Sequence, residues 1–290
     1  MALKIYLNGK MVAKEDAKVS VFDHGLLYGD GAFEGIRAYS GVVFRLKEHI
    51  DRLYETCHTM MIDIGLTKKE MIEALVKTLK ANGLTDGYIR LVVTRGDGDL
   101  GLDPRKCRNG ANIIIIADKI TLYPEELYKN GLTIVTVPTV RNHPEAINPQ
   151  LKSLNYLNNI MAKIEANNAG VPEAIMLDGS GYVAECTGDN IFMVKDGIMR
   201  TPSQGRLRGV TRDAVMELAA KKLKLDVRED FITRHELYNA EEIFLTGTAA
   251  ELIPVVKIDG RVIGSGKPGV VTGKLLKLFH EMVRKDGVKF

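Results

Sequence analysis

The sequence contains no tryptophan, few cysteines and no long hydrophobic run. Its three cysteines, Cys57, Cys107 and Cys186, have an odd count and no paired metal-type spacing, which favours a reducing cytoplasm over a disulfide-rich secreted protein. The longest uninterrupted aliphatic run, 113–116, is too short to cross a bilayer. The N-terminus also lacks the apolar run of a signal peptide. Because tryptophan is absent, the large wall residues of any binding pocket must be Phe, Tyr or Met.

An excess of charge of either sign is also missing. The chain carries 40 Lys and Arg against 37 Asp and Glu, a formal net charge of +3 over 290 residues. This balance gives no support for a nucleic acid or a membrane as partner, and we expect neither. Apolar residues make up 45% of the chain and charged residues 27%, which is ordinary for a globular protein. A chain of this length can bury a sizeable core and favours two domains.

Many short strands and fewer helices are predicted, which favours an α+β fold over a doubly wound sheet. In the first half we expect a hairpin around Asn8-Gly9, helices at 46–61 and 68–82, and strands at 88–95 and 112–117. In the second half we expect a strand at 132–138, a helix beginning near Lys152, short strands between 174 and 200, a helix from about 209 to 223, strands at 225–229 and 242–247, and a terminal helix from about 270. The predicted division is a small N-terminal α+β domain at 1–120, an interdomain loop at 121–130 and a large C-terminal cofactor-binding domain at 131–290.

The segment 96–101, Gly-Asp-Gly-Asp-Leu-Gly, follows a predicted strand and imitates a dinucleotide-binding fingerprint. That fingerprint needs a helix after the glycines, within a crossover of a dozen or more residues. Here only the short, polar, proline-containing stretch 102–110 separates two strands. We therefore interpret these strands as antiparallel neighbours joined by a protruding loop, which argues against a nicotinamide-dependent dehydrogenase.

The chain is organised around residues 148–169. Lys152 lies at or just before a helix in which apolar residues recur at helical spacing, at Leu157, Ile160, Met161 and Ile164. A lysine amine can form a Schiff base, and polar partners within a few residues can orient whatever it holds. Taken alone, Lys152 could equally be a solvated surface lysine.

Three further features point to a phosphorylated cofactor. Gly209-Val210-Thr211 precedes an amphipathic helix, so N–H groups, a hydroxyl and the helix dipole face any anion there. Gly247-Thr248-Ala249-Ala250 follows a buried strand and offers a second nest of N–H groups. Arg52 could supply the compensating charge in a bidentate manner. Each feature has a plainer interpretation, but together with a Schiff-base lysine they suggest pyridoxal phosphate.

The order of these motifs resembles the class IV, fold-type IV pyridoxal-phosphate aminotransferases, and most closely the branched-chain amino acid aminotransferases. The resemblance covers nearly the whole chain and is carried by Tyr28-Gly29, Phe33 to Arg37, Arg52, Tyr88-Ile89-Arg90, Leu100 to Pro104, Lys152 to Tyr156, Glu185 to Asn190, Gly209 to Asp213 and Gly247 to Glu251. It implies the two-domain fold of the D-amino acid aminotransferase type, with the cofactor in the cleft between the domains. It also implies a homodimer or a higher homo-oligomer.

The resemblance implies a role for each cofactor-binding residue. Lys152 would hold pyridoxal 5'-phosphate and act as the base that moves a proton between the substrate Cα and the cofactor C4′. Glu185 would pair with the pyridine nitrogen, and Tyr156 would hydrogen-bond the phenolic oxygen. The phosphate would be held by Arg52, Val210, Thr211, Gly247 and Thr248. Cys186 departs from the pattern, because relatives commonly have glycine after the glutamate.

The substrates implied by the resemblance are leucine, isoleucine and valine, with 2-oxoglutarate as amino acceptor and L-glutamate and branched 2-oxo acids as products of a ping-pong mechanism. The expected substrate-binding residues are Tyr28, Phe33, Gly35, Tyr88, Arg90, Leu102, Thr248 and Ala249, with Leu102 reaching in from a neighbouring subunit. Arg90 would pair with the distal carboxylate of glutamate, and Thr248 and the N–H groups after it would bind the α-carboxylate.

Two alternatives use the same fold and the same lysine. A D-amino acid aminotransferase is disfavoured by Arg90 in Tyr-x-Arg and by a 96–104 loop without the Arg-x-His arrangement of that subfamily. An aminodeoxychorismate lyase would eliminate pyruvate rather than exchange nitrogen. Outside catalysis, a nonenzymatic dimer that has lost its cofactor is disfavoured because Lys152, Glu185 and Tyr156 are all present.

Overall fold

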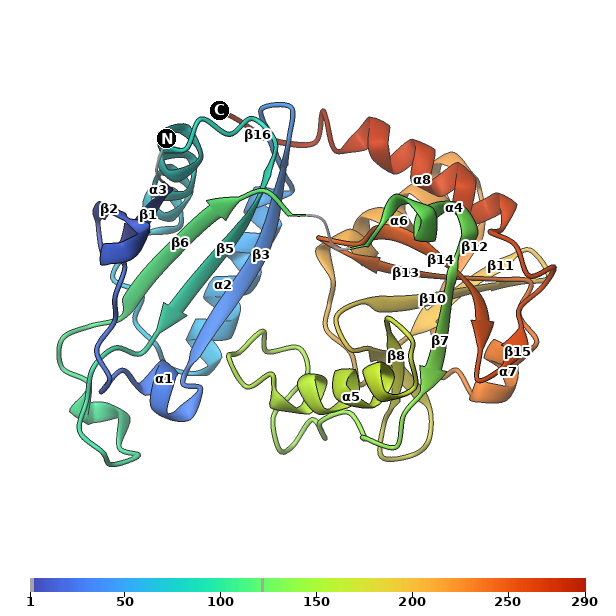
Figure 1. The fold of residues 1–290 in the computed structure, drawn as a ribbon, viewed down its shortest axis with the longest axis horizontal. Helices are drawn as coiled ribbons and strands as arrows, with labels where there is room; N and C mark the ends of the chain where they lie inside the picture. The colour runs from blue at the N-terminus through green and yellow to red at the C-terminus, as the bar shows by residue number, and fades with distance from the viewer. Residues whose placement is uncertain (1–2, 121–122) are drawn as a thin grey trace. The chain divides into compact units, whose positions relative to one another are not determined.

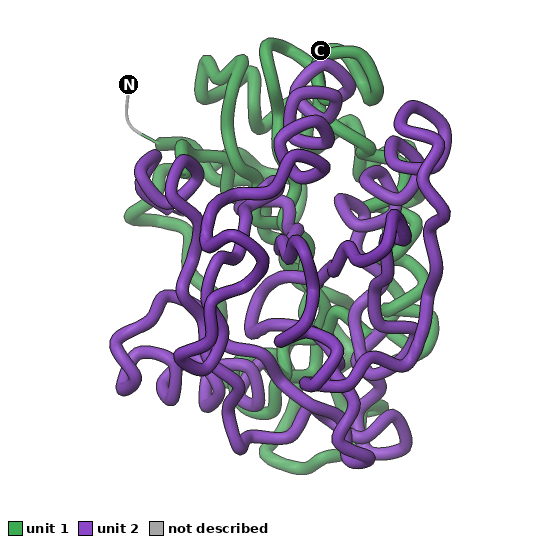
Figure 2. Tube along the Cα trace, turned by 90° about the vertical axis from the view of Figure 1, so that its right-hand side faces the viewer, with its two compact units in different colours: residues 1–120, 151–155, 283–290 green, residues 121–150, 156–282 purple. Residues whose placement is uncertain are grey.

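The chain divides into two compact units, seen in a computed structural model that describes residues 3–120 and 123–290 (Figures 1 and 2). Unit 1 comprises Met1–Ile120, Leu151–Asn155 and Val283–Phe290, and unit 2 comprises Thr121–Gln150 and Tyr156–Met282. Two short segments from the second half of the sequence therefore pack in unit 1, and one of them contains Lys152. That each unit folds independently, as the term domain implies, stays a prediction.

Unit 1 is built on a seven-stranded antiparallel sheet in the order β16-β4-β3-β5-β6-β1-β2. Its strands are β1 (Lys4–Leu7), β2 (Lys10–Ala13), β3 (Gly31–Tyr39), β4 (Val42–Phe44), β5 (Gly87–Thr94), β6 (Asn112–Asp118) and β16 (Gly287–Lys289). The β3 strand pairs with β5 from Gly31 opposite Thr94 to Ala38 opposite Gly87. The strands β5 and β6 are antiparallel neighbours, which confirms the interpretation of the segment between them as a protruding loop.

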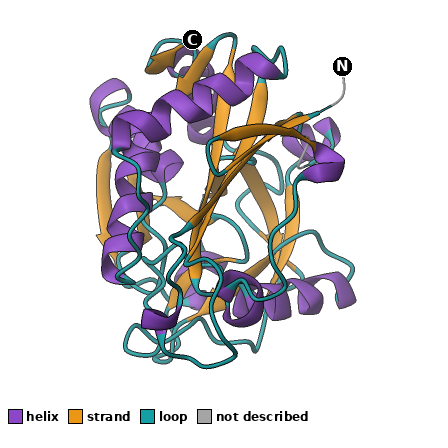
Figure 3. Ribbon diagram, turned by 90° about the vertical axis from the view of Figure 1, so that its left-hand side faces the viewer, coloured by secondary structure: helices purple, strands orange, loops and turns teal. Residues whose placement is uncertain are grey.

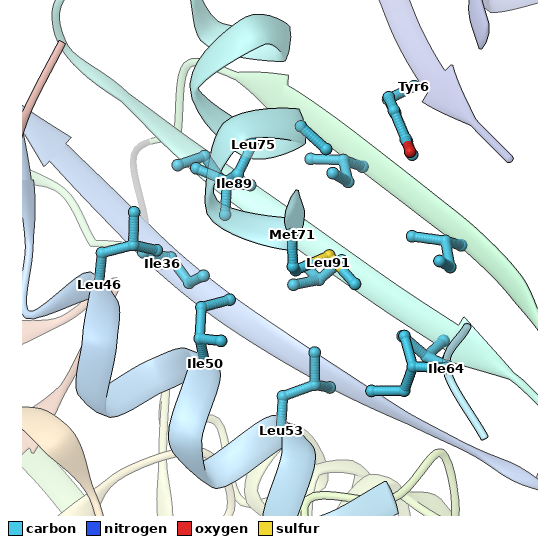
Figure 4. Packing of buried hydrophobic residues seen from close by; sticks show 14 of the residues in the cluster. Tyr6, Ile36, Leu46, Ile50, Leu53, Ile64, Met71, Leu75, Ile89 and Leu91 are labelled. Carbon is cyan, nitrogen blue, oxygen red and sulfur yellow. The ribbon is translucent and has the colours of Figure 1, made fainter. Parts of the chain in front are cut away.

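Two amphipathic helices, α2 (Leu46–Thr59) and α3 (Lys68–Ala81), cover one face of this sheet. Their apolar stripes pack on alternate residues of the strands: Leu53 of α2 and Leu75 of α3 are fully buried, as are Ile36 of β3 and Leu91 of β5 (Figure 4). A capping box between Thr67 and Glu70 begins α3. Because strand side chains alternate, the other residues of β3 and β5 point to the opposite face of the sheet.

Unit 2 contains a nine-stranded mixed sheet in the order β12-β11-β10-β13-β14-β7-β8-β9, with β15 paired to β14. Its strands are β7 (Leu132–Thr136), β8 (Ala174–Leu177), β9 (Val183–Cys186), β10 (Asn190–Lys195), β11 (Ile198–Pro202), β12 (Asp226–Asp230), β13 (Glu242–Gly247), β14 (Glu251–Ile258) and β15 (Arg261–Val262). Its helices are α4 (Glu125–Asn130), α5 (Leu157–Asn168), α6 (Val210–Lys222), α7 (Arg234–Tyr238) and α8 (Val270–Met282) (Figure 3). The pairs β11–β12, β14–β7 and β7–β8 are parallel and the others antiparallel, which agrees with the predicted α+β class.

Three local features differ from the sequence expectations. The helix α4 occupies part of the expected loop 121–130, of which residues 121–122 lie outside the described part; its acidic first turn and polar pattern concealed it. A short helix, α1 (His24–Tyr28), precedes β3: Asp23 caps its start, and Gly29 ends it in the left-handed conformation. The third concerns Lys152, which was expected at or just before a helix start: α5 begins at Leu157, so Lys152 lies five residues before the helix and not at its start.

The apolar stripe that predicted α5 lies on its exposed side. Leu157, Ile160, Met161 and Ile164 are 68%, 51%, 47% and 44% exposed, whereas the buried residues of the helix are Asn159, Ala162 and Ala166. Of the helices in the described part of the chain, none has both the length and the apolar character that a membrane span needs.

Candidate active site

The lysine segment runs alongside β3. The Phe33 N–H donates to the Lys152 carbonyl (3.0 Å), and the Leu154 N–H donates to the Gly31 carbonyl (2.9 Å). On its other side, the Lys152 N–H donates to the hydroxyl of Thr56 in α2 (3.3 Å). The Lys152 Nζ lies 4.6 Å from the centroid of the Phe33 ring. These contacts hold a half-buried amine beside an aromatic ring, on backbone anchored to the sheet.

Four of the expected substrate-binding residues share the sheet face opposite the helices. Phe33 and Gly35 are alternate residues of β3, and Tyr88 and Arg90 are alternate residues of β5, with Gly35 directly opposite Arg90. The Arg90 guanidinium lies 4.8 Å from the Phe33 ring centroid and donates to the Tyr88 hydroxyl (3.2 Å). A Cβ at position 35 would come within 2.0 Å of that hydroxyl, so any other residue there would displace the Tyr88 side chain. The tertiary structure therefore brings these four residues together.

The other two expected substrate residues of unit 1, Tyr28 and Leu102, lie on a helix and on a loop. The Tyr28 hydroxyl donates to the Leu100 carbonyl (2.6 Å), which ties α1 to the 96–104 loop. The Leu102 side chain is 78% exposed. A loop that presents an apolar side chain to solvent is compatible with the expected role of Leu102 toward a neighbouring subunit.

Arg52 belongs to a buried polar cluster that the sequence did not reveal. Its Nε and Nη2 donate to the two carboxylate oxygens of Glu34 (2.7 and 2.8 Å), and Glu34 also accepts from His49 Nδ1 (2.8 Å). Burial by itself raises the pKa of Glu34, but the charge of Arg52 and the contacts with His49 lower it to about 2. Arg52 thus makes a bidentate pair with a carboxylate of the chain, and its expected role toward a phosphate stays a prediction.

In unit 2, Glu185 lies on β9 and is 5% exposed. Its carboxylate accepts from Arg141 Nε (2.8 Å), from the Leu207 N–H (2.9 Å) and from the Asn190 amide (3.2 Å). Arg141 in turn donates to Asn158 of α5 (3.2 Å). Sequence reasoning assigned no role to Arg141 or Asn190, although Asn190 ends the recognised motif 185–190 and Arg141 lies shortly after the predicted strand 132–138. Three N–H donors around one group match a carboxylate acting as acceptor only.

Two consecutive residues, Asp189 and Asn190, contact the two glycines that open the candidate anion-binding segments. Gly209 is the N-cap of α6, has no side-chain cap, and packs so closely on Asn190 that a Cβ would lie 2.1 Å from its Oδ1. Gly247 ends β13, and a Cβ there would lie 2.0 Å from Asp189 Oδ1. The segments 209–211 and 247–250 are thus held by neighbouring positions of one strand connection. Within them Val210 and Thr211 are buried, while Thr248 and Ala249 are half-buried.

The remaining expected cofactor residue, Tyr156, is the half-buried N-cap residue of α5, two positions before Asn158. Cys186, the departure from the family pattern, is 1% exposed and packs in the apolar core of unit 2. Burial raises the pKa of its thiol well above the ordinary value. Its side chain therefore fills space behind Glu185 as a small apolar group.

Asp189 lies in a buried acidic environment. Burial raises the pKa of its carboxyl to about 7, and the negative charge of Glu173 acts in the same direction, while Lys163 and the hydrogen bond from Tyr123 oppose it. Glu173 is 2% exposed and accepts from the N–H groups of Ala174 and Thr187. The Asp189 carboxyl therefore keeps its proton to a higher pH than an ordinary aspartic acid.

The chain belongs to the class IV aminotransferase family, whose profile matches residues 31–258. A protein of Methanocaldococcus jannaschii, assigned provisionally as a branched-chain-amino-acid aminotransferase, is 56% identical over 289 residues, which cover 99% of each chain. The crystal structure of the Escherichia coli branched-chain amino acid aminotransferase is similar with a TM-score of 0.94 and 37% identity, covering 98% of this chain and 95% of that one. The T.th. branched-chain amino acid aminotransferase complexed with N-(5'-phosphopyridoxyl)-L-glutamate gives a TM-score of 0.92 and 38% identity, with 98% and 94% covered. The fold is therefore the fold-type IV aminotransferase fold, as the resemblance implied.

The raised pKa of Asp189 leads to a prediction about stability. The folded chain binds more protons than the unfolded chain between the ordinary value of 3.8 and about 7, so the free energy of unfolding falls as the pH rises through this range. Replacing Asp189 with Asn removes this term, so the loss of stability between pH 5 and pH 8 should shrink by an amount on the order of 2 kcal/mol.

Urea unfolding followed by circular dichroism at both pH values measures this loss. The control is Asp226→Asn, because Asp226 is exposed and its pKa is lowered by Arg228, so it does not titrate between pH 5 and pH 8. If the free energy of unfolding of Asp189→Asn changes between pH 5 and pH 8 by the same amount as in the original chain, the raised pKa of Asp189 is contradicted.

Proposed function

We propose that this chain is a pyridoxal 5'-phosphate-dependent branched-chain amino acid aminotransferase. It transfers the amino group of leucine, isoleucine or valine to 2-oxoglutarate and releases the branched 2-oxo acid and L-glutamate in a ping-pong cycle. The observation that carries the proposal is similarity over 98–99% of the chain to branched-chain amino acid aminotransferases. One of these was solved with a ligand that joins the phosphopyridoxyl group to glutamate.

The residues of both units fit this cofactor. An uncapped α6 N-terminus with N–H groups at 210 and 211, the turn 248–250 and Arg52 suit a phosphate dianion. A buried carboxylate, Glu185, surrounded by N–H donors, suits a protonated pyridine nitrogen. A half-buried lysine beside the Phe33 ring suits attachment of an aldehyde.

When bound, pyridoxal phosphate supplies an electron sink for the carbanion formed at the substrate Cα. Lys152 would hold the cofactor aldehyde through its Nζ, and its amine would serve as the base that takes the proton from the substrate Cα and returns it. Glu185 would pair with the protonated pyridine nitrogen, and Arg141 contacts the Glu185 carboxylate and so keeps it in place. Tyr156 would donate to the phenolic oxygen, and the phosphate would be held by Arg52, Val210, Thr211, Gly247 and Thr248.

The substrate is proposed to contact the sheet face that carries Phe33, Gly35, Tyr88 and Arg90. The aromatic rings suit an aliphatic side chain, and glycine at position 35 leaves the Tyr88 hydroxyl in place beside Arg90. Arg90 has the charge and geometry to pair with the distal carboxylate of glutamate. Tyr28 is proposed to close the same region, and the Thr248 hydroxyl and the Ala249 N–H to bind the α-carboxylate. A cytoplasmic location, expected from the cysteine count, stays a prediction.

The half-reactions distinguish this function from its alternatives. The purified protein is mixed separately with L-leucine, D-alanine and aminodeoxychorismate, and the visible spectrum of the bound cofactor is followed. L-Leucine alone should convert the cofactor to its pyridoxamine form, and 2-oxoglutarate should reverse the change. If D-alanine converts the cofactor and L-leucine does not, the protein is a D-amino acid aminotransferase. Release of pyruvate from aminodeoxychorismate would indicate a lyase.

Replacing Lys152 with Ala should abolish covalent attachment of the cofactor and reduce turnover by at least about 10⁴-fold, since both the attachment and the proton transfer need the amine. Borohydride reduction followed by mass spectrometry of the intact chain measures the attachment. The matched control is Lys69→Ala, because Lys69 in α3 has a side chain that is 87% exposed. A Lys152→Ala variant that keeps full turnover would refute the assignment.

We also infer that the chain forms a homo-oligomer through the exposed stripe of α5, which consists of Leu157, Ile160, Met161 and Ile164. Four large apolar side chains at helical spacing on one exposed face are typical of an interface rather than of a solvated surface. A second copy of the chain is the occupant implied by the family. In such an assembly the exposed Leu102 is proposed to reach the substrate of a neighbouring subunit.

Analytical ultracentrifugation tests this inference. The protein should sediment at a multiple of its 32.1 kDa chain mass, and Ile160→Asp should shift it toward the single chain. The control is Lys69→Asp, which introduces the same charged side chain at an exposed position of α3 in unit 1. A chain that is monomeric at micromolar concentration, or an assembly unaffected by Ile160→Asp, would contradict the role of the stripe.

A further inference from the structure

Glu34 is a charged residue on a face of β3 that is otherwise apolar. The β3 side chains that face helices α2 and α3 are Ala32, Glu34, Ile36 and Ala38, and the other three belong to the apolar core of unit 1. Glu34 is 0% exposed. A buried carboxylate is costly unless it is paired, and an apolar residue would fill this position more favourably. The polar partners of Glu34 therefore call for a functional explanation.

The pairing of Glu34 with Arg52 determines how the guanidinium points. Both carboxylate oxygens are used, Oε1 by Nε at 2.7 Å and Oε2 by Nη2 at 2.8 Å. Two parallel hydrogen bonds fix the plane of a guanidinium as well as its position, which a single contact does not. The orientation of Arg52 is thus set from β3, the strand that also holds Lys152 through the Phe33 N–H.

His49 in turn fixes the carboxylate. Burial lowers the pKa of His49, and the charges of Arg52 and Lys152 act in the same direction, while Glu34 opposes them. The ring is therefore neutral at neutral pH and uses its Nδ1–H to donate to Glu34 Oε2 at 2.8 Å. Together Glu34 accepts three N–H groups, which a carboxylate can do and an amide cannot, because the amide nitrogen would face donors.

We propose that Glu34 is a positioning residue that aims Arg52 at the phosphate of the cofactor, so that it governs recognition of the phosphate monoester and not of the pyridine ring. The proposal rests on the proposed function, in which Arg52 binds that phosphate. Electrostatics alone would give the opposite result, because removing a buried negative charge beside Arg52 strengthens the attraction for an anion. Whether the affinity for pyridoxal 5'-phosphate falls or rises when Glu34 loses its charge therefore distinguishes positioning of Arg52 from an effect of net charge.

The test compares two ligands that differ only in the phosphate. The full-length chain, freed of cofactor, is titrated by equilibrium dialysis with pyridoxal 5'-phosphate and with pyridoxal. For Glu34→Gln we expect affinity for pyridoxal 5'-phosphate to fall about tenfold or more, with less than about a twofold change for pyridoxal. Glu34→Asp keeps the charge but is one methylene shorter, so it should lose part of the preference for pyridoxal 5'-phosphate over pyridoxal. This variant provides the test if Glu34→Gln does not fold.

The matched control is Asp286→Asn. Asp286 pairs with Arg45, at the start of the same helix as Arg52, through Nε to Oδ2 at 2.6 Å. This variant removes a carboxylate from an arginine of unit 1 without touching Glu34, and should leave the preference for the phosphorylated ligand unchanged. An equal loss of both ligands in the Glu34 variants, or unchanged or tighter binding of pyridoxal 5'-phosphate, would overturn the proposal. Failure of the unaltered chain to bind pyridoxal 5'-phosphate would instead refute the proposed function.

Discussion

Successive residues of β3 point to opposite faces of the unit 1 sheet, and the candidate site of that unit depends on this alternation. Phe33 and Gly35 share the face that carries Tyr88 and Arg90, whereas Glu34 between them points to α2 and holds Arg52. The backbone of the same strand binds the Lys152 segment. A shift of one residue in the register of β3 would exchange its two faces and separate all of these groups.

In unit 2, the residues from the end of β9 to the start of β10 hold several candidate site groups at once. Glu185 ends a chain of contacts that begins at Asn158 of α5 and passes through Arg141. Asn190 joins that carboxylate to the start of α6, and Asp189 packs on Gly247 at the end of β13. One short segment therefore aligns a buried acid with two groups of backbone N–H donors. A Cβ at position 209 or 247 would displace the Asn190 or Asp189 side chain, so glycine at both positions preserves this arrangement.

Local chemistry made some of this structure predictable. Apolar residues at helical spacing identified α2, α3, α5 and α8, and the short polar connection at 102–110 identified β5 and β6 as antiparallel neighbours. Lys152 stood out because lysine is the side chain with a primary amine that can bind an aldehyde, and the glycine-led segments at 209 and 247 stood out because a helix start or a turn leaves backbone N–H groups available to an anion. The short helices α1 and α4 were not predicted, because five or six residues are too few to show a helical period.

The sequence by itself determined the fold class, the family and the candidate reactive groups, since these depend on residue type and on order along the chain. Only the tertiary structure decided that Lys152 packs in unit 1, that Arg52 is oriented by Glu34 and His49, and that Arg141 and Asn190 support Glu185. It also placed the apolar stripe of α5 on the exposed side of that helix. The physical reason is that most of these partners are far apart in the chain, such as Glu34 and His49 (15 residues), Arg141 and Glu185 (44 residues) or Lys152 and Thr56 (96 residues). They meet through strand pairing and helix packing, which no local pattern records.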